Sequence, residues 1–200
     1  AVREPAVPAP TANEAPPATS LRTDLRPLRA FLTVVALSAF GAGVDLFLLV
    51  RASELGARPL HLPLLWAVLH CVRATLAAPL GTLSDRLGRR RVIALGLGAQ
   101  TLVLAAFALA QDLALIWPLF LLHGLHAAFT EGAERGYVAD LTGASRRGTI
   151  YGVYYATQGL AAFAAPLWIG GLWDSHGATT ALLVAATASA LGLLVLLRFV

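Results

Sequence analysis

Residues 92–110, with the sequence VIALGLGAQTLVLAAFALA, contain no charged side chain. An α-helix rises about 1.5 Å per residue, so this stretch would form a helix about 28 Å long. The hydrocarbon core of a lipid bilayer is about 30 Å thick. The stretch therefore predicts a helix that crosses a membrane, and the remainder of the chain repeats the pattern.

Five further apolar runs of similar length flank this stretch. They cover residues 30–50, 62–83, 113–135, 149–173 and 178–197. Strands that face lipid alternate apolar and polar residues, and these continuous runs do not. The predicted fold is therefore an all-α membrane protein in which residues 28–200 form a bundle of six transmembrane helices.

The composition supports lipid as the solvent of this bundle. Hydrophobic residues make up 58% of the chain and charged residues 13%, whereas charged residues make up about 25% of a typical soluble domain. Residues 1–27 differ, because they hold six of the eleven prolines and show no apolar period. Such a segment predicts a disordered cytoplasmic tail or a linker.

The positions of the arginines predict the orientation of the helices. All 15 basic residues are Arg, and 12 of them fall in segments on one side of the predicted membrane. Arg51 and Arg58 fall on the other side, and Arg73 lies within a span. Basic residues accumulate on the cytoplasmic side, which predicts that both termini are cytoplasmic. This distribution accounts for the pI near 10.0 without a nucleic-acid partner.

A short motif occurs twice in the chain. Residues 77–88 and 164–177 both read A-A-P-L followed by G-x-L-x-D-x-x-G, with two extra residues between the two parts in the second copy. One copy falls at the predicted inner end of the second span and the other at the outer end of the fifth. Two three-helix repeats of opposite orientation would place the copies in this way, as in many secondary transporters. Chance matching in a chain rich in Ala, Gly and Leu is the alternative explanation.

The loop between the second and third spans, GTLSDRLGRRR at residues 81–91, resembles the G-x-x-x-D-R-x-G-R-[RK] motif of the major facilitator superfamily. Glycine at the first position permits close approach of helices, and the second glycine suits a turn. The aspartate can accept hydrogen bonds from arginine or from a helix start. The motif residues, predicted to act as a gating loop, are Gly81, Asp85, Arg86, Gly88, Arg89 and Arg90.

Further stretches extend the resemblance over residues 28–200. Residues 47–56 are similar to the outer end of the seventh helix in a bacterial branch of these transporters, and residues 130–152 to the tenth helix and the following loop. The resemblance implies the carboxy-terminal half, helices 7 to 12, of a proton-coupled carrier in the plasma (inner) membrane of a bacterium. It implies a small-molecule substrate, alternating access, no cofactor, and an amino-terminal half as partner.

Ionisable residues within spans are costly, so each is a candidate for the substrate path. His123, His126, Thr130 and Glu134 follow one another at helical spacing and predict one polar face. This face would line a substrate path or relay protons. The alternative for Glu131 and Glu134 is a structural pair at the inner interface, with Arg135, Arg146 or Arg147.

His70 and Arg73 lie one helical turn apart near the middle of the second span. Arginine keeps its proton, so at membrane depth it requires an anion, a carboxylate or water. A substrate anion would satisfy Arg73, and so would a structural pair with Asp45. Both interpretations stay open at this point.

Tyr154, Tyr155 and Gln158 share one face of the fifth span and could contact a small amphipathic substrate. Two other functions are weighed against transport. A zinc enzyme would require H-E-x-x-H, but His123 and His126 are three residues apart and Gly124 follows the first, so no metal is expected. A half-sized protein that dimerises, or a membrane scaffold, is the second alternative.

Overall fold

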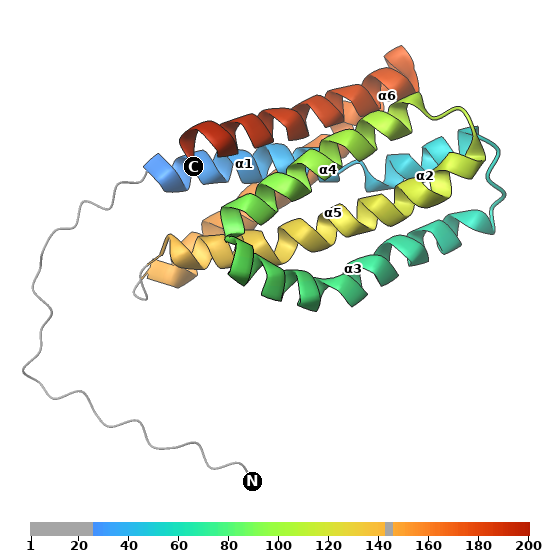
Figure 1. Cartoon of the computed structure of the whole chain (residues 1–200). Coiled ribbons are helices and arrows are strands. Elements are labelled where there is room, and N and C mark those ends of the chain that lie inside the picture. The colour runs from blue at the N-terminus through green and yellow to red at the C-terminus, as the bar shows by residue number, and fades with distance from the viewer. Residues whose placement is uncertain (1–25, 143–145) are drawn as a thin grey trace, which may run out of the picture.

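The computed structural model describes residues 26–142 and 146–200 (Figure 1). Within these residues every regular element is a helix, which confirms the all-α prediction. The helices are α1 (Arg26–Ala42), α2 (Asp45–Glu54), α3 (His61–Leu87), α4 (Arg89–Leu109), α5 (Leu113–Asp140) and α6 (Arg147–Phe199).

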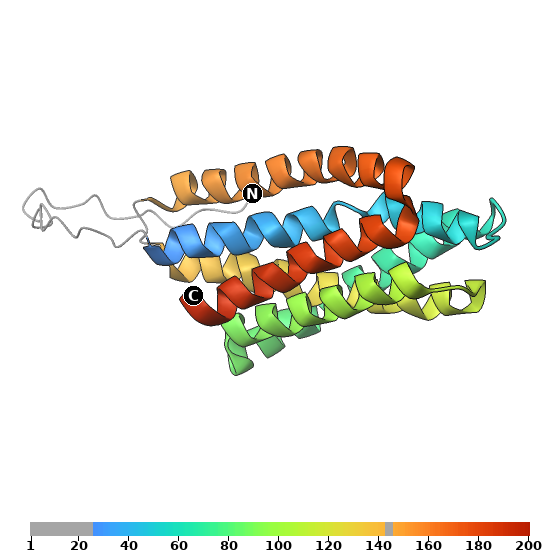
Figure 2. The ribbon, with the colours of Figure 1, turned by 90° about the horizontal axis from the view of Figure 1, so that it is seen from above.

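Five helical stretches are long and apolar enough to cross a membrane, with α1 and α2 counted together. The stretch α6 has 53 residues, and a straight helix of that length would measure about 80 Å, far more than a bilayer. The helix is interrupted at Gly177, where φ is 81° and ψ is 170°. Figure 2 shows that it turns back there, so α6 consists of a first arm, residues 147–176, and a second arm, residues 178–199. With the two arms counted separately, the helices correspond to the six predicted runs.

The start of the bundle differs from the prediction in two respects. Helix α1 begins at Arg26, so it takes in the last two residues of the predicted tail, and residues 1–25 lie outside the described part of the chain. The predicted run 30–50 is not one helix, because a turn at Gly43 and Val44 separates α1 from α2. A Cβ atom on Gly43 would lie 2.6 Å from the Cβ of Ala165. Glycine at this turn therefore allows the chain to lie directly against the first arm of α6.

The helix contacts show the predicted repeat. The first span, α1 with α2, contacts both arms of α6, while the fourth span, α5, contacts α3 and α4. Helix α4 also packs against the second arm of α6. If the first, second and third spans are exchanged with the fourth, fifth and sixth spans respectively, the same set of helix contacts results. Because consecutive spans run in opposite directions, the two triplets are inverted relative to one another.

The glycine that ends each copy of the short motif has the same backbone conformation. Gly88 has a φ of 91° and Gly177 a φ of 81°. Each connects the second helix of its triplet to the third without an intervening loop, and only glycine adopts such angles without strain. The sequence repeat is thus also a structural repeat.

Equivalent residues after these glycines make equivalent hydrogen bonds. Arg90, two residues after Gly88, donates from Nη2 to the carbonyl oxygen of Leu197 at 2.8 Å. Thr179, two residues after Gly177, donates from Oγ1 to the carbonyl oxygen of Ala108 at 3.1 Å. Each bond satisfies a carbonyl near the carboxy-terminal end of the opposite helix, where intrahelical donors run out. Helix α4 and the second arm of α6 are therefore joined at both ends.

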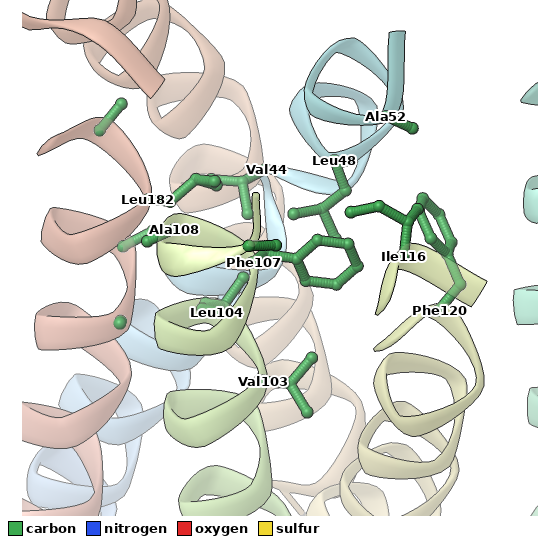
Figure 3. Close-up of a cluster of buried hydrophobic side chains, with 14 of the residues drawn as sticks. Val44, Leu48, Ala52, Val103, Leu104, Phe107, Ala108, Ile116, Phe120 and Leu182 are labelled. Carbon is green, nitrogen blue, oxygen red and sulfur yellow. The ribbon is translucent and has the colours of Figure 1, made fainter. Parts of the chain in front are cut away.

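Two apolar clusters form the core, one toward each end of the bundle. The Phe107 cluster includes Leu48, Phe107 and Phe120, with the two phenylalanine rings 5.3 Å apart and perpendicular (Figure 3). The Phe31 cluster lies toward the Gly88 turn and includes Val92 of α4. In α1 and α4 the buried polar residues Ser38 and Gln100 fall between the segments that form the two clusters, and in α5 His123, His126 and Thr130 do so, whereas Glu134 lies next to Ala133 at the edge of the Phe31 cluster.

Few residues of helix α3 and of the first arm of α6 are buried by the other described helices. Of the 27 residues of α3, only Leu65, Leu69 and Ser84 are buried. The first arm of α6 likewise buries Tyr154, Ala165 and Ile169. These two helices are equivalent in the repeat, and both flank the polar layer between the clusters.

The Gly177 turn provides a test of the six-span fold. We expect Gly177→Ala to lower the unfolding temperature in detergent, because a Cβ atom at this φ and ψ costs about 1–3 kcal/mol. The matched control is Gly171→Ala in the first arm of α6, where a Cβ would meet no described atom within 4 Å. This control should stabilise the helix by up to about 1 kcal/mol. Equal effects of the two substitutions on thermal unfolding would contradict the assigned turn.

Candidate functional site

A cavity of about 430 Å³ lies between the two apolar clusters. Five helical segments contribute to its wall: α1, α2, α3, α5 and the first arm of α6. The polar side chains that line it are Ser38, Asp45, Arg73, His123, His126, Thr130, Glu131, Glu134, Tyr155 and Gln158.

Small residues make room for the cavity. Ala39, Ala42 and Gly43 line it from the first span, and Gly159 and Ala162 from the first arm of α6. Larger side chains at these positions would fill the space. These positions were not predicted from the sequence, although the spacing of three and four residues from Ala39 to Ala42 and Gly43, next to Asp45, is a signal for the first three.

The predicted polar face of α5 is present. His123, His126, Thr130 and Glu134 all line the cavity, and the two imidazoles and the carboxylate are no more than 3% exposed. The next residue, Arg135, lies about 100° further around the helix and is exposed.

Asp45 and His123 form a pair across the cavity. The Nε2 atom of His123 lies 2.8 Å from Oδ1 of Asp45, within hydrogen-bond distance. Asp45 is the first residue of α2, directly after the turn that separates α1 from α2. The turn thus places the carboxylate where α5 passes. The other ring nitrogen of His123, Nδ1, has no hydrogen-bond partner among the described residues.

Arg73 forms an ion pair with Glu131. The structural alternative, in which Arg73 pairs with Asp45, is therefore wrong, because Asp45 is bound to His123 instead. The pairing of Glu131 with Arg135 or Arg147 is wrong as well. Glu131 extends from α5 toward α3, and these two helices pack extensively against each other.

Glu134 is held by two neutral groups rather than by an arginine. The hydroxyl of Tyr154 donates to Oε2 of Glu134 at 3.1 Å, and Nε2 of Gln158 donates to the same hydroxyl oxygen at 3.0 Å. The second carboxylate oxygen, Oε1, is buried and has no partner within the described residues. Tyr154 itself is buried behind Glu134 and does not line the cavity.

The three arginines predicted to pair with these glutamates lie elsewhere. Arg135 donates from Nε to the backbone oxygen of Glu131 at 3.1 Å, a contact within one helix. Arg146 and Arg147 are exposed at the start of α6 and take part in none of the ion pairs found in the described part of the chain. None of the three arginines lines the cavity.

His70 is not part of the cavity wall. Its ring packs edge-on against Trp66, with the centroids 4.8 Å apart. His70 lies only one turn before Arg73, but it is not among the residues that line the cavity. His70 is therefore removed from the set of substrate candidates that the sequence predicted.

The described residues include no group of three or more His, Cys, Asp or Glu placed to hold a metal ion. The rings of His123 and His126 are 4.7 Å apart.

The arrangement of six spans around a polar cavity agrees with the comparison to known families. The sequence profile of the Major Facilitator Superfamily matches residues 12–200. The chain belongs to this superfamily of membrane transporters. Over 175 residues it is 29% identical to an uncharacterized MFS-type transporter of Methanocaldococcus jannaschii. The match covers 84% of the chain and 44% of that relative, so the chain spans less than half the length of the relative.

The superfamily motif between α3 and α4 forms a charge network at one end of the bundle. Arg89 Nη2 lies 3.4 Å from Oδ1 of Asp85, and Arg89 Nε lies 3.3 Å from Oδ2 of Asp140 on α5. The guanidinium group lies against Gly136, where a side chain would displace it. The network thus ties the end of α3 to the end of α5.

The motif residues take some of the positions predicted for them and not others. Asp85 accepts from an arginine and Gly88 forms the turn, as predicted. The close helix approach predicted at Gly81 is wrong for the described chain, since a Cβ there would meet nothing within 4 Å. Arg86 is exposed at the end of α3.

The pairing of Arg73 is testable by a double-mutant cycle on thermal unfolding in detergent. We expect Arg73→Gln and Glu131→Gln each to destabilise the protein, because each leaves an unmatched charge. The double variant should lose less than the sum, with a coupling energy of about 0.5–3 kcal/mol. In the control cycle, Arg73→Gln with Asp45→Asn, the coupling should be smaller. A larger coupling to Asp45 than to Glu131 would overturn the assignment.

Proposed function

We propose that this chain is the carboxy-terminal half of a secondary transporter that moves a small solute by alternating access. The observation that carries the proposal is the cavity between the two clusters, where buried polar atoms of His123, His126 and Glu134 have no hydrogen-bond partner among the residues that the structure describes. Buried polar groups without hydrogen bonds are costly, so such a site suits a solute or water. Ionisable residues at membrane depth most often mark a transport path.

We propose that the pair of Asp45 and His123 couples transport to protons. An imidazole changes its charge near neutral pH and a carboxylate can share its proton. The 2.8 Å contact joins α2 to α5 across the cavity. Protonation of this pair would therefore change a contact between two spans, which is what coupling requires.

A second six-helix bundle is proposed to cover the open side of the cavity. Helix α3 and the first arm of α6 carry exposed apolar side chains, Phe163, Leu167 and Trp168 among them. The match to less than half of a transporter favours an amino-terminal half as the partner. A second copy of this chain would cover the same faces. Crosslinking in native membranes separates the two, because a fused half gives one long polypeptide and a second copy gives a dimer.

The orientation of the bundle in the membrane is proposed from its arginines. Arg86, Arg89, Arg90 and Arg91 flank the Gly88 turn, and the start of α1 and the carboxy terminus lie at the same end (Figures 1 and 2). This end faces the cytoplasm according to the positive-inside tendency. The Gly177 turn then faces outward.

Labelling in intact cells tests this orientation. In a Cys71→Ala background, Asp174→Cys should react with a membrane-impermeant maleimide from outside, since it lies beside the Gly177 turn. We expect Arg91→Cys to react only after the cells are permeabilised. Reaction of both in intact cells, or the reverse pattern, would contradict the proposed orientation.

Proton coupling is testable with the complete gene product in proteoliposomes that contain a trapped pH indicator. Addition of a transported solute should produce a proton flux, because movement of the solute is proposed to be coupled to movement of protons. Asp45→Asn removes the carboxylate that shares the proton, so we expect proton flux to fall at least tenfold while solute exchange persists. The control is Asp174→Asn, an exposed carboxylate outside the cavity. Unchanged proton flux in Asp45→Asn would remove this pair from the coupling step.

A further inference from the structure

We propose that the solute carried through the cavity is an organic cation, and that the Glu134 carboxylate holds its charged group. This inference rests on the proposed transport function and adds the chemical class of the solute. It comes from the charges that line the cavity and from the partners that each charge already has.

The cavity contains more negative than positive groups. Its lining includes three carboxylates, Asp45, Glu131 and Glu134, and one guanidinium, that of Arg73. With all three carboxylates ionised and both imidazoles neutral, the lining would carry two more negative than positive charges. A low-dielectric wall strengthens the attraction of such an excess for a cation.

The single guanidinium is already matched. Arg73 is bound to Glu131, so its charge is not available for an anionic solute. An anion would have to displace Glu131, which would leave a further carboxylate without a partner. This pair disfavours the anionic substrate that the position of Arg73 alone suggested.

The negative charge of Asp45 can also be neutralised within the protein. His123 lies against its carboxylate, and a protonated imidazole would neutralise it. The side chains around Glu134 include the hydroxyls of Tyr154 and Ser38 and the amide of Gln158, all uncharged, and within the described residues Glu134 forms no ion pair with an arginine. Glu134 is therefore the carboxylate that stays unmatched in either protonation state of His123.

The geometry of Glu134 suits a ligand. Its side chain is 3% exposed and lines the cavity. Tyr154 and Gln158 fix one carboxylate oxygen, Oε2, while the buried Oε1 has no partner within the described residues. A buried carboxylate oriented by one oxygen and free at the other is arranged to accept a hydrogen bond or a positive charge.

An aromatic ring in the same cavity defines the class of cation further. Tyr155 lines the cavity and is 50% exposed, and its ring centroid lies 5.0 Å from that of Tyr154. Aromatic faces bind ammonium groups and other diffuse cations. Leu69 and Ala162 add an apolar wall. The site thus fits an amine or quaternary cation that carries an apolar group, rather than a small inorganic ion.

The test measures charge preference with two probes of the same shape. Tetraphenylphosphonium is a cation and tetraphenylborate is its anionic counterpart. Binding of each to the complete gene product in nanodiscs, corrected for empty nanodiscs, should favour the cation at least tenfold. Equal binding, or preference for the anion, would overturn the inference without use of any variant.

Variants locate the site. Glu134→Gln should weaken cation binding at least tenfold and leave anion binding unchanged, while Asp174→Asn should change neither. Because Glu134 is buried, thermal unfolding must show that its variant remains folded. Tyr155→Ala, at a partly exposed ring, is the second variant and should weaken cation binding several-fold. Unchanged cation binding in folded Glu134→Gln would also overturn the inference.

Proton flux in proteoliposomes separates this inference from the transport proposal. If anionic or neutral solutes drive proton flux as well as cations do, transport stands and the cation preference is wrong. If cations bind selectively and none of the solutes drives proton flux, the cation site stands and the proposal of proton-coupled transport is wrong.

Discussion

A charged side chain inside a bilayer needs a partner, and this constraint shapes the middle of the bundle. Water is absent from the hydrocarbon core, so each charge must be matched by a neighbouring helix or by what enters the cavity. Asp45 is matched by His123, and Arg73 by Glu131. Both pairs end on α5, which makes this helix the common element of the polar layer. Contacts of α2 and α3 with α5 therefore depend on charge matching as well as on apolar packing.

The polar layer is narrow because an apolar cluster bounds it on either side. The ring of Phe107 packs against both Phe120 and His123, so the cluster continues to the edge of the cavity. The cavity exists between the clusters because alanine and glycine stand where larger residues would close it. Shared ancestry with other major facilitators explains the helical framework, whereas these particular side chains set the chemistry of the cavity.

The sequence predicted those features that depend on local geometry. Runs of apolar residues gave the spans, helical spacing gave the polar face of α5, and the repeated motif located the Gly88 and Gly177 turns. The partner of Arg73 could not be predicted in this way. Glu131 lies 58 residues further along the chain, and which carboxylate reaches Arg73 depends on how far α3 and α5 are shifted along each other. The break between α1 and α2 was also missed, because apolar runs do not reveal a turn within them.

The paired bonds of Arg90 and Thr179 bear on how such a bundle can move. Hydrogen bonds join α4 and the second arm of α6 near both ends of the two helices. We therefore expect these helices to resist sliding and to move together. We expect deformation to fall instead on elements with less support, chiefly the joint at Gly43 and the two sparsely buried helices, α3 and the first arm of α6. The side of the molecule that contains the cavity would then be the side that bends, while α4 and the second arm of α6 stay fixed relative to each other.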